Sequence, residues 1–359
     1  MTHRKNVKIL LEDGHEFNGY SFGGTESAAG EVVFNTSMTG YPENLTDPSY
    51  KGQILVATYP LIGNYGVPEV PIESGLFSPF ESGRVQISGL IISDYSSKFS
   101  HWNAAKSLSD WLTEHNIPGV CGVDTRKLTR IIREKGTMLG KIIIDRDIVF
   151  YDPNNDNIVS QVSINSRQIY GDGRIRILLI DCGAKNNIIR CLVKRGTTVY
   201  RVPWDFRFDP ADFDGIVLSN GPGDPKMCRE TIDTTRRIIQ GETPTFGICL
   251  GFQIMALAAG ADTYKLKYGH RSQNQPVLMT GTNRCFITSQ NHGYAVNSDT
   301  LPADWTSFFV NLNDNTCEGI RHKYKPFFSV QFHPEASAGP VDTEFLFDEF
   351  MDMIKQKIR

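Results

Sequence analysis

The sequence lacks the features that mark membrane and secreted proteins. No apolar run approaches the ~20 residues that a helix needs to cross a bilayer. The N-terminal stretch MTHRKNVKILLEDG has neither the apolar core nor the cleavage signal of a secretory leader. The formal net charge is only −3 and both signs are scattered, so no basic surface for nucleic acid is indicated. We expect a cytoplasmic protein that binds neither membrane nor nucleic acid.

Metal and nucleotide motifs are also missing. The seven cysteines include no C-x-x-C pair, and none has metal-ligand spacing with a histidine. In a chain of 359 residues, this favours reduced thiols over a disulfide framework. The pattern G-x-x-x-x-G-K-[ST] of phosphate-binding loops does not occur. We therefore expect no metal and no cofactor in this chain.

What the sequence does contain predicts two globular domains. A length of 359 residues exceeds one ordinary domain, and 40% hydrophobic with 21% charged residues is typical of a packed core. Residues 151–173 are polar, rich in Asn and Asp, and contain Gly, as linkers do. The predicted domains are therefore residues 1–150 and 174–359.

The first of these domains has the pattern of a mixed α/β fold. KILLEDGHEFNGYSFG predicts a hairpin, and GEVVFNTS and QILVATYP predict strands. The apolar spacing of HWNAAKSLSDWLTEHN predicts an amphipathic helix over 101–116. A second helix is predicted over 124–136, with Asp124 or Thr125 as its cap and Gly136 as its stop.

The second domain alternates strand and helix from residue 174 to 260, which predicts a doubly wound α/β fold with a mostly parallel sheet. The apolar run IRILLIDCGAK is typical of a buried parallel strand. Later segments such as FFSVQFHPE are also strand-like, and DTEFLFDEFMDMIKQKIR predicts a closing helix. In such folds, ligands bind at the carboxyl ends of the strands.

One predicted strand-to-helix turn carries a candidate nucleophile. G-I-C-L-G has the spacing of a nucleophile elbow, with Cys249 in place of serine. Gly247 and Gly251 permit a turn that side chains would block. The N-terminus of the following helix would favour the thiolate form of the cysteine. The alternative is a buried cysteine that acts only as a small hydrophobe.

The segment Q-F-H-P-E offers a base and its partner. His333 and Glu335 project to the same face of an extended segment, because residues i and i+2 do so. Pro334 disfavours helix at His333 and so maintains the extended shape. Glu335 could accept a hydrogen bond from the imidazole and fix its tautomer. The alternative is a surface histidine with a chance acidic neighbour.

A glycine-containing loop, LSNGPGDP, follows another predicted strand on the same sheet edge. Gly221 and Gly223 allow backbone N–H groups to approach a substrate closely. Together with the N–H of Leu250, such donors could stabilise the oxyanion of an acyl-transfer intermediate. The alternative is a tight turn, for which Gly-Pro-Gly-Asp is well suited.

In this order and spacing, NGPGDP, GICLG and HPE resemble the class I glutamine amidotransferases, which cleave the glutamine side-chain amide through a thioester and release ammonia. The N-terminal half is similar to the small chain of carbamoyl-phosphate synthase, particularly in GEVVFNTSMTGYPENLTDPSYKGQILVATYPLIGNYG and GVDTRKLTRIIREKG. YGHRSQNQPV, SQNHGYAV and HPEASAGP strengthen this resemblance, which covers nearly the whole chain.

The resemblance implies a role for particular residues. Cys249 would be the nucleophile, His333 the base and then the acid, and Glu335 the carboxylate that orients His333. The residues implied to bind glutamine are Ser49, Gly221, Gly223, Leu250, Gln253, Asn291, Gly293 and Tyr294. Since Ser49 lies in the first domain, the resemblance implies a site at the domain interface.

Two departures from the family pattern concern the pocket wall. Many members read CLGHQ where this chain has CLGFQ, with Phe252, and many read GHHGGNHPV where it has GHRSQNQPV. Many also carry Phe at the position of Tyr294. None of these changes touches the three catalytic positions. We expect His292 to be structural, and we leave His270 unassigned.

The resemblance also implies a partner. Glutamine would be the substrate, and a separate large chain would receive the ammonia and hold the ATP and Mg²⁺ used to make carbamoyl phosphate, for pyrimidine and arginine synthesis. The pair would form a heterodimer or a higher oligomer. Three alternatives are an amidotransferase that serves another synthetase (for anthranilate or guanylate), a stand-alone cysteine γ-glutamyl hydrolase, and a regulatory subunit that binds glutamine without cleaving it. The N-terminal half disfavours the first, and the joint presence of Cys249, His333 and Glu335 disfavours the last.

Overall fold

The computed structural model describes residues 5–69, 72–73, 75–77 and 79–358. The chain forms two compact units, one of residues 1–73 and 77–156 and the other of residues 74–76 and 157–359. The main division follows Asp156, inside the segment predicted as a linker. The later part of that segment contains strand β14 (Gln168–Tyr170), which pairs antiparallel with a strand of the C-terminal sheet.

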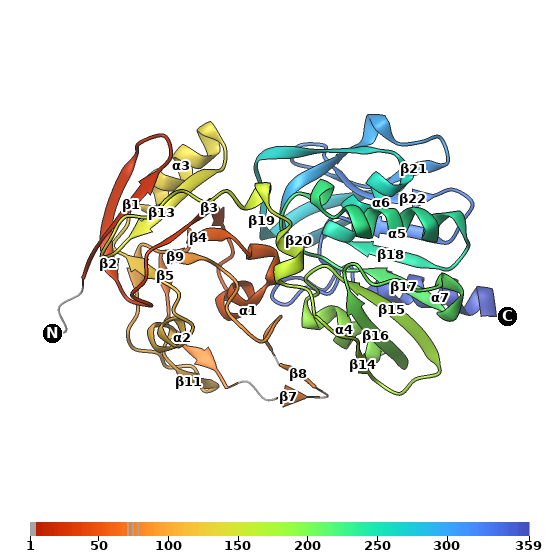
Figure 1. Cartoon of the computed structure of the whole chain (residues 1–359), viewed down its shortest axis with the longest axis horizontal. Helices are drawn as coiled ribbons and strands as arrows, with labels where there is room; N and C mark the ends of the chain where they lie inside the picture. The colour runs from red at the N-terminus through yellow and green to blue at the C-terminus, as the bar shows by residue number, and fades with distance from the viewer. Residues whose placement is uncertain (1–4, 70–71, 74, 78, 359) are drawn as a thin grey trace. The chain divides into compact units, whose positions relative to one another are not determined.

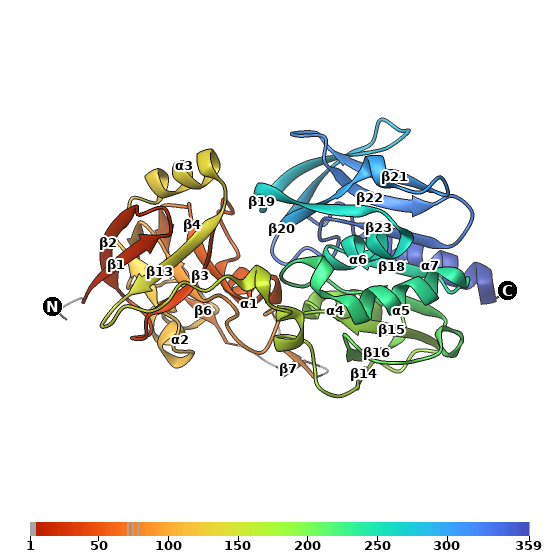
Figure 2. The same cartoon turned by 45° about the horizontal axis from the view of Figure 1, so that its top comes forward.

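A closed barrel forms the centre of the N-terminal unit (Figure 2). Its strands, in barrel order, are β1 (Asn6–Leu11), β13 (Met138–Ile143), β3 (Ala28–Asn35), β4 (Gln53–Ala57), β9 (Gly89–Ile91), β12 (Gly119–Cys121) and β2 (Glu16–Ser21). The predicted hairpin is confirmed, since β1 and β2 pair antiparallel. Val7, Ile9 and Leu11 alternate into the core, as expected for a strand with one buried face.

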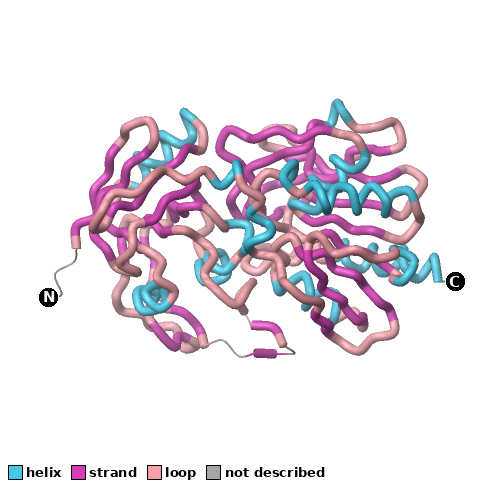
Figure 3. Tube along the Cα trace, viewed as in Figure 1, coloured by secondary structure: helices cyan, strands magenta, loops and turns pink. Residues whose placement is uncertain are grey.

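Short elements complete this unit, which is mostly strand and loop (Figure 3). The strands are β5 (Leu61–Ile62), β6 (Val67–Pro68), β7 (Ile72–Glu73), β10 (Asp94–Tyr95) and β11 (Ala104–Lys106). Strand β8 (Leu76–Phe77) is shared, since Leu76 belongs to the C-terminal unit and Phe77 to this one. The helices are α1 (Tyr41–Thr46), α2 (Leu108–Glu114) and α3 (Thr125–Lys135), with 3-10 turns η1 (Pro48–Tyr50) and η2 (Pro153–Asn155).

The two helix predictions for this unit had different outcomes. Helix α3 is confirmed, with the Asp124 side chain accepting from the Lys127 N–H and Gly136 ending the helix. The prediction for 101–116 was too long. Ser107 accepts a hydrogen bond from the Asp110 N–H and starts α2 there, while β11, just before it, pairs with β6.

The C-terminal unit is built on a ten-stranded sheet. Its strands, in sheet order, are β14, β16 (Thr197–Pro203), β15 (Ile175–Asp181), β17 (Gly215–Leu218), β18 (Thr245–Ile248), β23 (Phe327–Val330), β22 (Cys317–His322), β20 (Cys285–Asn297), β19 (Asp262–Met279) and β21 (Trp305–Asn311). The pairs from β16 to β23 are parallel, whereas those from β23 to β21 are antiparallel. The predicted mostly parallel core is thus confirmed, with an antiparallel extension.

Helices cover both faces of the parallel part (Figure 1). The helices of this unit are α4 (Asn186–Val193), α5 (Arg229–Gln240), α6 (Leu250–Ala259) and α7 (Phe345–Ile358), with 3-10 turns η3 (Ile158–Gln161), η4 (Pro210–Asp212), η5 (Pro225–Met227) and η6 (Ser298–Thr300). On β15, Ile177 and Leu179 pack with α4 and α7, whereas Leu178 and Ile180 pack with α5 and α6. This alternation of buried residues on one strand is what the doubly wound prediction requires.

The topology brings four chain segments to one sheet edge. Neighbouring parallel strands β15, β17, β18 and β23 are followed by CGAK, SNGPGDP, CLG and QFHPE, respectively. Segments far apart in sequence therefore meet where the carboxyl ends of the strands lie. No helix among the described residues is both long and apolar enough to cross a membrane.

Candidate active site

Cys249 occupies a strained turn between β18 and α6. Its backbone has φ 54° and ψ −103°, a conformation that non-glycine residues rarely adopt. The turn depends on close backbone approach at both flanking glycines. A Cβ on Gly247 would lie 2.7 Å from the Gly251 oxygen, and one on Gly251 would lie 2.2 Å from the Leu218 oxygen. The Cys249 side chain thus sits at the N-terminus of α6, where backbone N–H groups have no partner within the helix.

His333 and Glu335 form the pair that the sequence predicts. The His333 Nδ1 lies 2.7 Å from Glu335 Oε1, and both side chains are buried. The backbone N–H of His333 donates to the Ser289 carbonyl, which anchors the segment that follows β23. With Nδ1 donating to Glu335, Nε2 is the nitrogen left to exchange a proton with a substrate.

Cys249 and His333 share one environment. Burial alone would lower the pKa of His333, but the Glu335 carboxylate, together with Cys249, raises it above its ordinary value, and Lys185 opposes that rise. Nε2 of His333 is buried and has no hydrogen-bond partner among the described residues. A nucleophile, an imidazole with a free nitrogen and an orienting carboxylate are therefore assembled.

Lys185 is a member of the site that the sequence reasoning missed. It follows β15, is itself buried, and places Nζ 3.1 Å from Glu335 Oε1 and 2.5 Å from the Ala336 carbonyl oxygen. Burial would raise the pKa of Glu335, but Lys185 and His333 lower it to about 2. The signal was a lysine four residues after the end of an apolar strand, at the edge where the site was expected.

Some of the predicted pocket residues of this unit contact Cys249 or one another. The Cys249 Sγ is 3.8 Å from the Asn291 carbonyl oxygen, and the Gln253 Nε2 donates to the Tyr294 carbonyl at 2.9 Å. In the glycine loop, a Cβ on Gly221 would lie 2.8 Å from a Leu250 methyl, so this loop lies against the start of α6. Gly223 has φ 86°, which favours glycine. Their contacts with glutamine stay predictions.

Ser49 belongs to the N-terminal unit, where η1 contains it. Its side chain is buried, and its backbone N–H donates to Asp47 Oδ1 at 2.9 Å. The role of Ser49 at a glutamine site, and the location of that site at a domain interface, stay predictions.

The departures from the family pattern have different surroundings. Phe252 is fully buried in the apolar cluster beneath α6, so its ring serves packing. Arg271 is buried and donates to the Tyr268 carbonyl at 2.8 Å. Its guanidinium also lies 3.2 Å from where a Cβ on Gly293 would be, so this departure does adjoin a predicted pocket residue.

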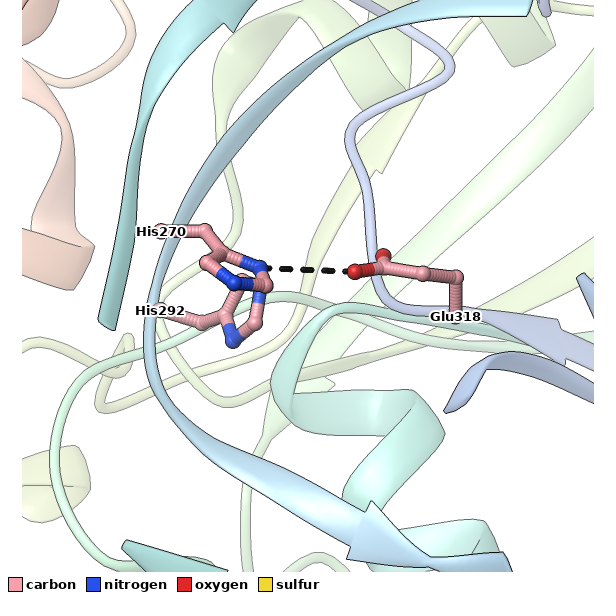
Figure 4. A group of neighbouring side chains, drawn as sticks. All are labelled: His270, His292 and Glu318. Carbon is pink, nitrogen blue, oxygen red and sulfur yellow. Dashed lines mark ion pairs between the residues drawn. The ribbon is translucent and has the colours of Figure 1, made fainter. Parts of the chain in front are cut away.

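A second histidine cluster lies in β19, β20 and β22 (Figure 4). Ligand atoms of His270, His292 and Glu318 come within 4.8 Å of one another. The Gln290 side chain occupies their centre. Its Oε1 lies 2.9 Å from His270 Nδ1 and 3.1 Å from His292 Nε2, and its Nε2 donates to Glu318 at 3.0 Å.

The remaining nitrogens of this cluster are engaged as well. His270 Nε2 lies 2.8 Å from Asp314 Oδ2, and His292 Nδ1 donates to the Tyr294 carbonyl at 2.8 Å. These residues make a buried polar cluster in which the Gln290 amide lies between the two imidazoles and Glu318, and a metal ion would have to displace that amide. We assign no metal to it. The placement of His292 inside this cluster is in line with the structural role expected for it.

Comparison with known proteins assigns both halves of the chain. The family model of class I glutamine amidotransferases matches residues 178–353, and that of the carbamoyl-phosphate synthase small chain, CPSase domain, matches residues 9–142. The fold and site thus define a protein with a class I glutamine amidotransferase domain.

Relatives that align with nearly the whole chain identify a narrower family within this class. The arginine-specific small chain of carbamoyl phosphate synthase from Saccharomyces cerevisiae is 49% identical over 363 residues, covering 97% of this chain and 88% of that one. The chain therefore belongs to the family of carbamoyl-phosphate synthase small chains.

Other relatives are much longer than this chain. Human mitochondrial carbamoyl-phosphate synthase [ammonia] is 51% identical over 98% of this chain, which spans 24% of that protein. The multifunctional protein CAD of Squalus acanthias is 52% identical over 96% of this chain, which spans 16% of it.

Proposed function

We propose that this chain hydrolyses glutamine to glutamate and ammonia and delivers the ammonia to a large synthetase chain that makes carbamoyl phosphate. The observation that carries the proposal is the arrangement around Cys249. A cysteine on a strained strand-to-helix turn lies beside an imidazole whose Nδ1 is held by a carboxylate and whose Nε2 is free.

The first step is attack by the Cys249 thiolate on the amide carbon of glutamine. The carbonyl oxygen gains negative charge, which N–H groups at the start of α6 and in the glycine loop can stabilise. Protonated His333 gives its Nε2 proton to the amide nitrogen, the C–N bond breaks, and ammonia leaves. A γ-glutamyl thioester on Cys249 remains.

The second step is hydrolysis of that thioester. His333, now neutral, takes a proton from water as the water oxygen attacks the thioester carbon. The C–S bond breaks, glutamate leaves, and the thiolate with its imidazolium partner is restored. Glu335 keeps Nδ1 in its donor role throughout, and Lys185 keeps Glu335 ionised.

The synthetase chemistry is assigned to the partner. We propose that ATP and Mg²⁺ bind only the large chain, that the two chains form a heterodimer or a higher oligomer in the cytoplasm, and that the product serves pyrimidine or arginine synthesis. The family membership supports this division, because small chains are by definition paired with a large one. The printed names of relatives include an arginine-specific small chain and a mitochondrial enzyme, so pathway and compartment need direct measurement.

The test measures carbamoyl phosphate from ATP and bicarbonate, with either glutamine or ammonia, after addition of a candidate large chain. Glutamine should support synthesis with the unaltered chain and fail with Cys249→Ser, whereas ammonia should support both. Loss of the ammonia-dependent reaction in the variant complex would show that the substitution damaged assembly instead of glutamine cleavage.

Glutamine hydrolysis by the isolated chain separates the proposal from a stand-alone hydrolase. We expect a low rate that rises when the large chain is added. Equal rates with and without the large chain would favour a γ-glutamyl hydrolase that acts alone.

A further inference from the structure

Gln331 lies two residues before His333 and has no role in the mechanism above. It directly follows β23, and its side chain is fully buried. Its backbone N–H donates to the Glu318 carbonyl at 2.8 Å, which holds the residue against β22. Its side-chain Nε2 lies 3.7 Å from the Cys249 Sγ.

The hydrogen-bond network determines which end of the Gln331 amide faces the sulfur. The Tyr294 carbonyl can only accept, so the Gln253 atom 2.9 Å from it must be the amide nitrogen. That same nitrogen lies 2.9 Å from one end of the Gln331 amide, which must therefore be the oxygen. The other end, next to Cys249, is then the NH₂ group, and it can only donate.

The sulfur therefore has a donor on one side and an acceptor on another. In the thiol form, Cys249 can donate to the Asn291 carbonyl, 3.8 Å away. In the thiolate form, that contact is lost, while the Gln331 N–H gains a charged acceptor. Hydrogen bonds to charged acceptors are about twice as strong as those between neutral groups, so this donor favours ionisation.

We propose that Gln331 is a positioning residue for the nucleophile, whose amide N–H holds the Cys249 sulfur in its thiolate form and aims it into the pocket. Gln253 fixes the orientation of that amide. The consequence for catalysis rests on the proposed function, because it concerns the same site. The effect on the sulfur itself does not depend on which substrate is cleaved.

The test compares thiolate formation in Gln331→Met and Gln331→Asn with the unaltered chain. Methionine is similar in length but has no donor, and asparagine is too short to reach both Gln253 and the sulfur. The ultraviolet absorbance of the thiolate is titrated against pH, and the same titration in a Cys249→Ser background is subtracted to isolate Cys249. The rate of alkylation of Cys249 by iodoacetamide, measured by peptide mass spectrometry, gives a second reading.

We expect the equilibrium constant for ionisation of the Cys249 thiol to fall about tenfold in both variants, the effect of one hydrogen bond to a charged group. The control is Gln86→Met, which removes another buried glutamine, in the N-terminal unit, whose Nε2 donates to Ser82. It should leave the Cys249 titration unchanged. An unaltered titration in folded Gln331→Met and Gln331→Asn overturns the inference.

Activity is measured separately on the assembled complex. With glutamine as substrate, kcat should fall by up to about tenfold, because the sulfur is held less firmly in its thiolate form. If the unaltered chain cleaves no glutamine but the titration still shifts, the proposed function fails and the inference about Gln331 stands.

Discussion

Two buried clusters in the C-terminal unit pair a histidine with carboxylates. They differ in whether the second ring nitrogen of that histidine has a hydrogen-bond partner. In the first, His333 has Nδ1 on Glu335 and Nε2 free beside Cys249. In the second, His270 has Nδ1 on Gln290 and Nε2 on Asp314, with Glu318 close by. Burial alone would lower the pKa of both histidines, but their carboxylates raise it, to about 9 for His270.

The difference teaches that a raised pKa does not by itself identify a catalytic base. His270 carries a charge that is fixed in place, because each of its nitrogens already contacts an oxygen. His333 has the same kind of partner but keeps one nitrogen for a proton that can move. The first cluster is therefore suited to chemistry and the second to holding β19, β20 and β22 together.

The largest effect should come from removing the nucleophile. Cys249→Ala should lower glutamine hydrolysis about 10⁴-fold or more, because no other group can form the thioester. The matched control is Cys317→Ala, which removes a buried thiol adjacent to Glu318 in the second cluster. That variant should keep hydrolysis within about threefold, since its thiol packs in the core. Comparable losses of hydrolysis in Cys249→Ala and Cys317→Ala would mean that activity depends on filling a buried cysteine site, and not on a nucleophile at the strained turn.

The two histidines should separate activity from stability. His333→Asn should lower kcat by about 10²–10⁴-fold, the usual contribution of a general acid and base. His270→Asn should keep hydrolysis largely intact but lower the free energy of unfolding by about 3 kcal/mol, because Asp314 and buried Glu318 lose their cation. Steady-state kinetics should show the loss of kcat in His333→Asn, and urea unfolding should show the loss of stability in His270→Asn. A fall in kcat alone for His270→Asn would place the second cluster in the catalytic machinery.

The sequence could predict those parts of the site whose residues are close together in the chain. The Cys249 turn and the His333–Glu335 pair are local, so glycine spacing and the i, i+2 rule were sufficient. Lys185 contacts Glu335 only because β15 and β23 belong to one sheet, with β17 and β18 between them, and no local pattern encodes that order. Gln331 did leave a signal, since Gln331, His333 and Glu335 are spaced to share one face after an apolar strand.

The secondary structure was likewise predictable only where the pattern is local. Helix α3 and the parallel strands followed from apolar spacing, whereas β19 did not. Along its 18 residues, buried and exposed positions do not alternate, because bulges shift its register against β20. The strand at Ala104–Lys106 was missed because its partner, β6, is distant in sequence. Residues that depend on such pairings were the ones that the sequence left unassigned.

The pH dependence of the free energy of unfolding should show whether His270 in the second cluster is held as a cation. The pKa of His270 is raised in the folded state, so its contribution is fully present below about pH 6.5 and is lost as pH rises through about 9. The difference in unfolding free energy between the unaltered chain and His270→Asn should therefore shrink by up to about 3 kcal/mol between pH 6 and pH 10. Urea titrations at several pH values measure it. A difference that stays constant with pH would show that His270 is not held as a cation.

The smallest effect should come from the residue at which the two clusters meet. The Tyr294 carbonyl accepts from Gln253 Nε2, on the active-site side, and from His292 Nδ1, on the side of the second cluster. Both contacts use the backbone, so Tyr294→Phe keeps them and should change the KM for glutamine by less than about threefold, within the usual ±0.5 kcal/mol of mild substitutions. Tyr264→Phe, on the neighbouring strand β19, is the control for loss of a tyrosine hydroxyl in this sheet. A KM at least tenfold higher in Tyr294→Phe alone would show that the Tyr294 hydroxyl recognises glutamine. Tyr294 would then bind the substrate directly, in addition to linking the two clusters through its carbonyl.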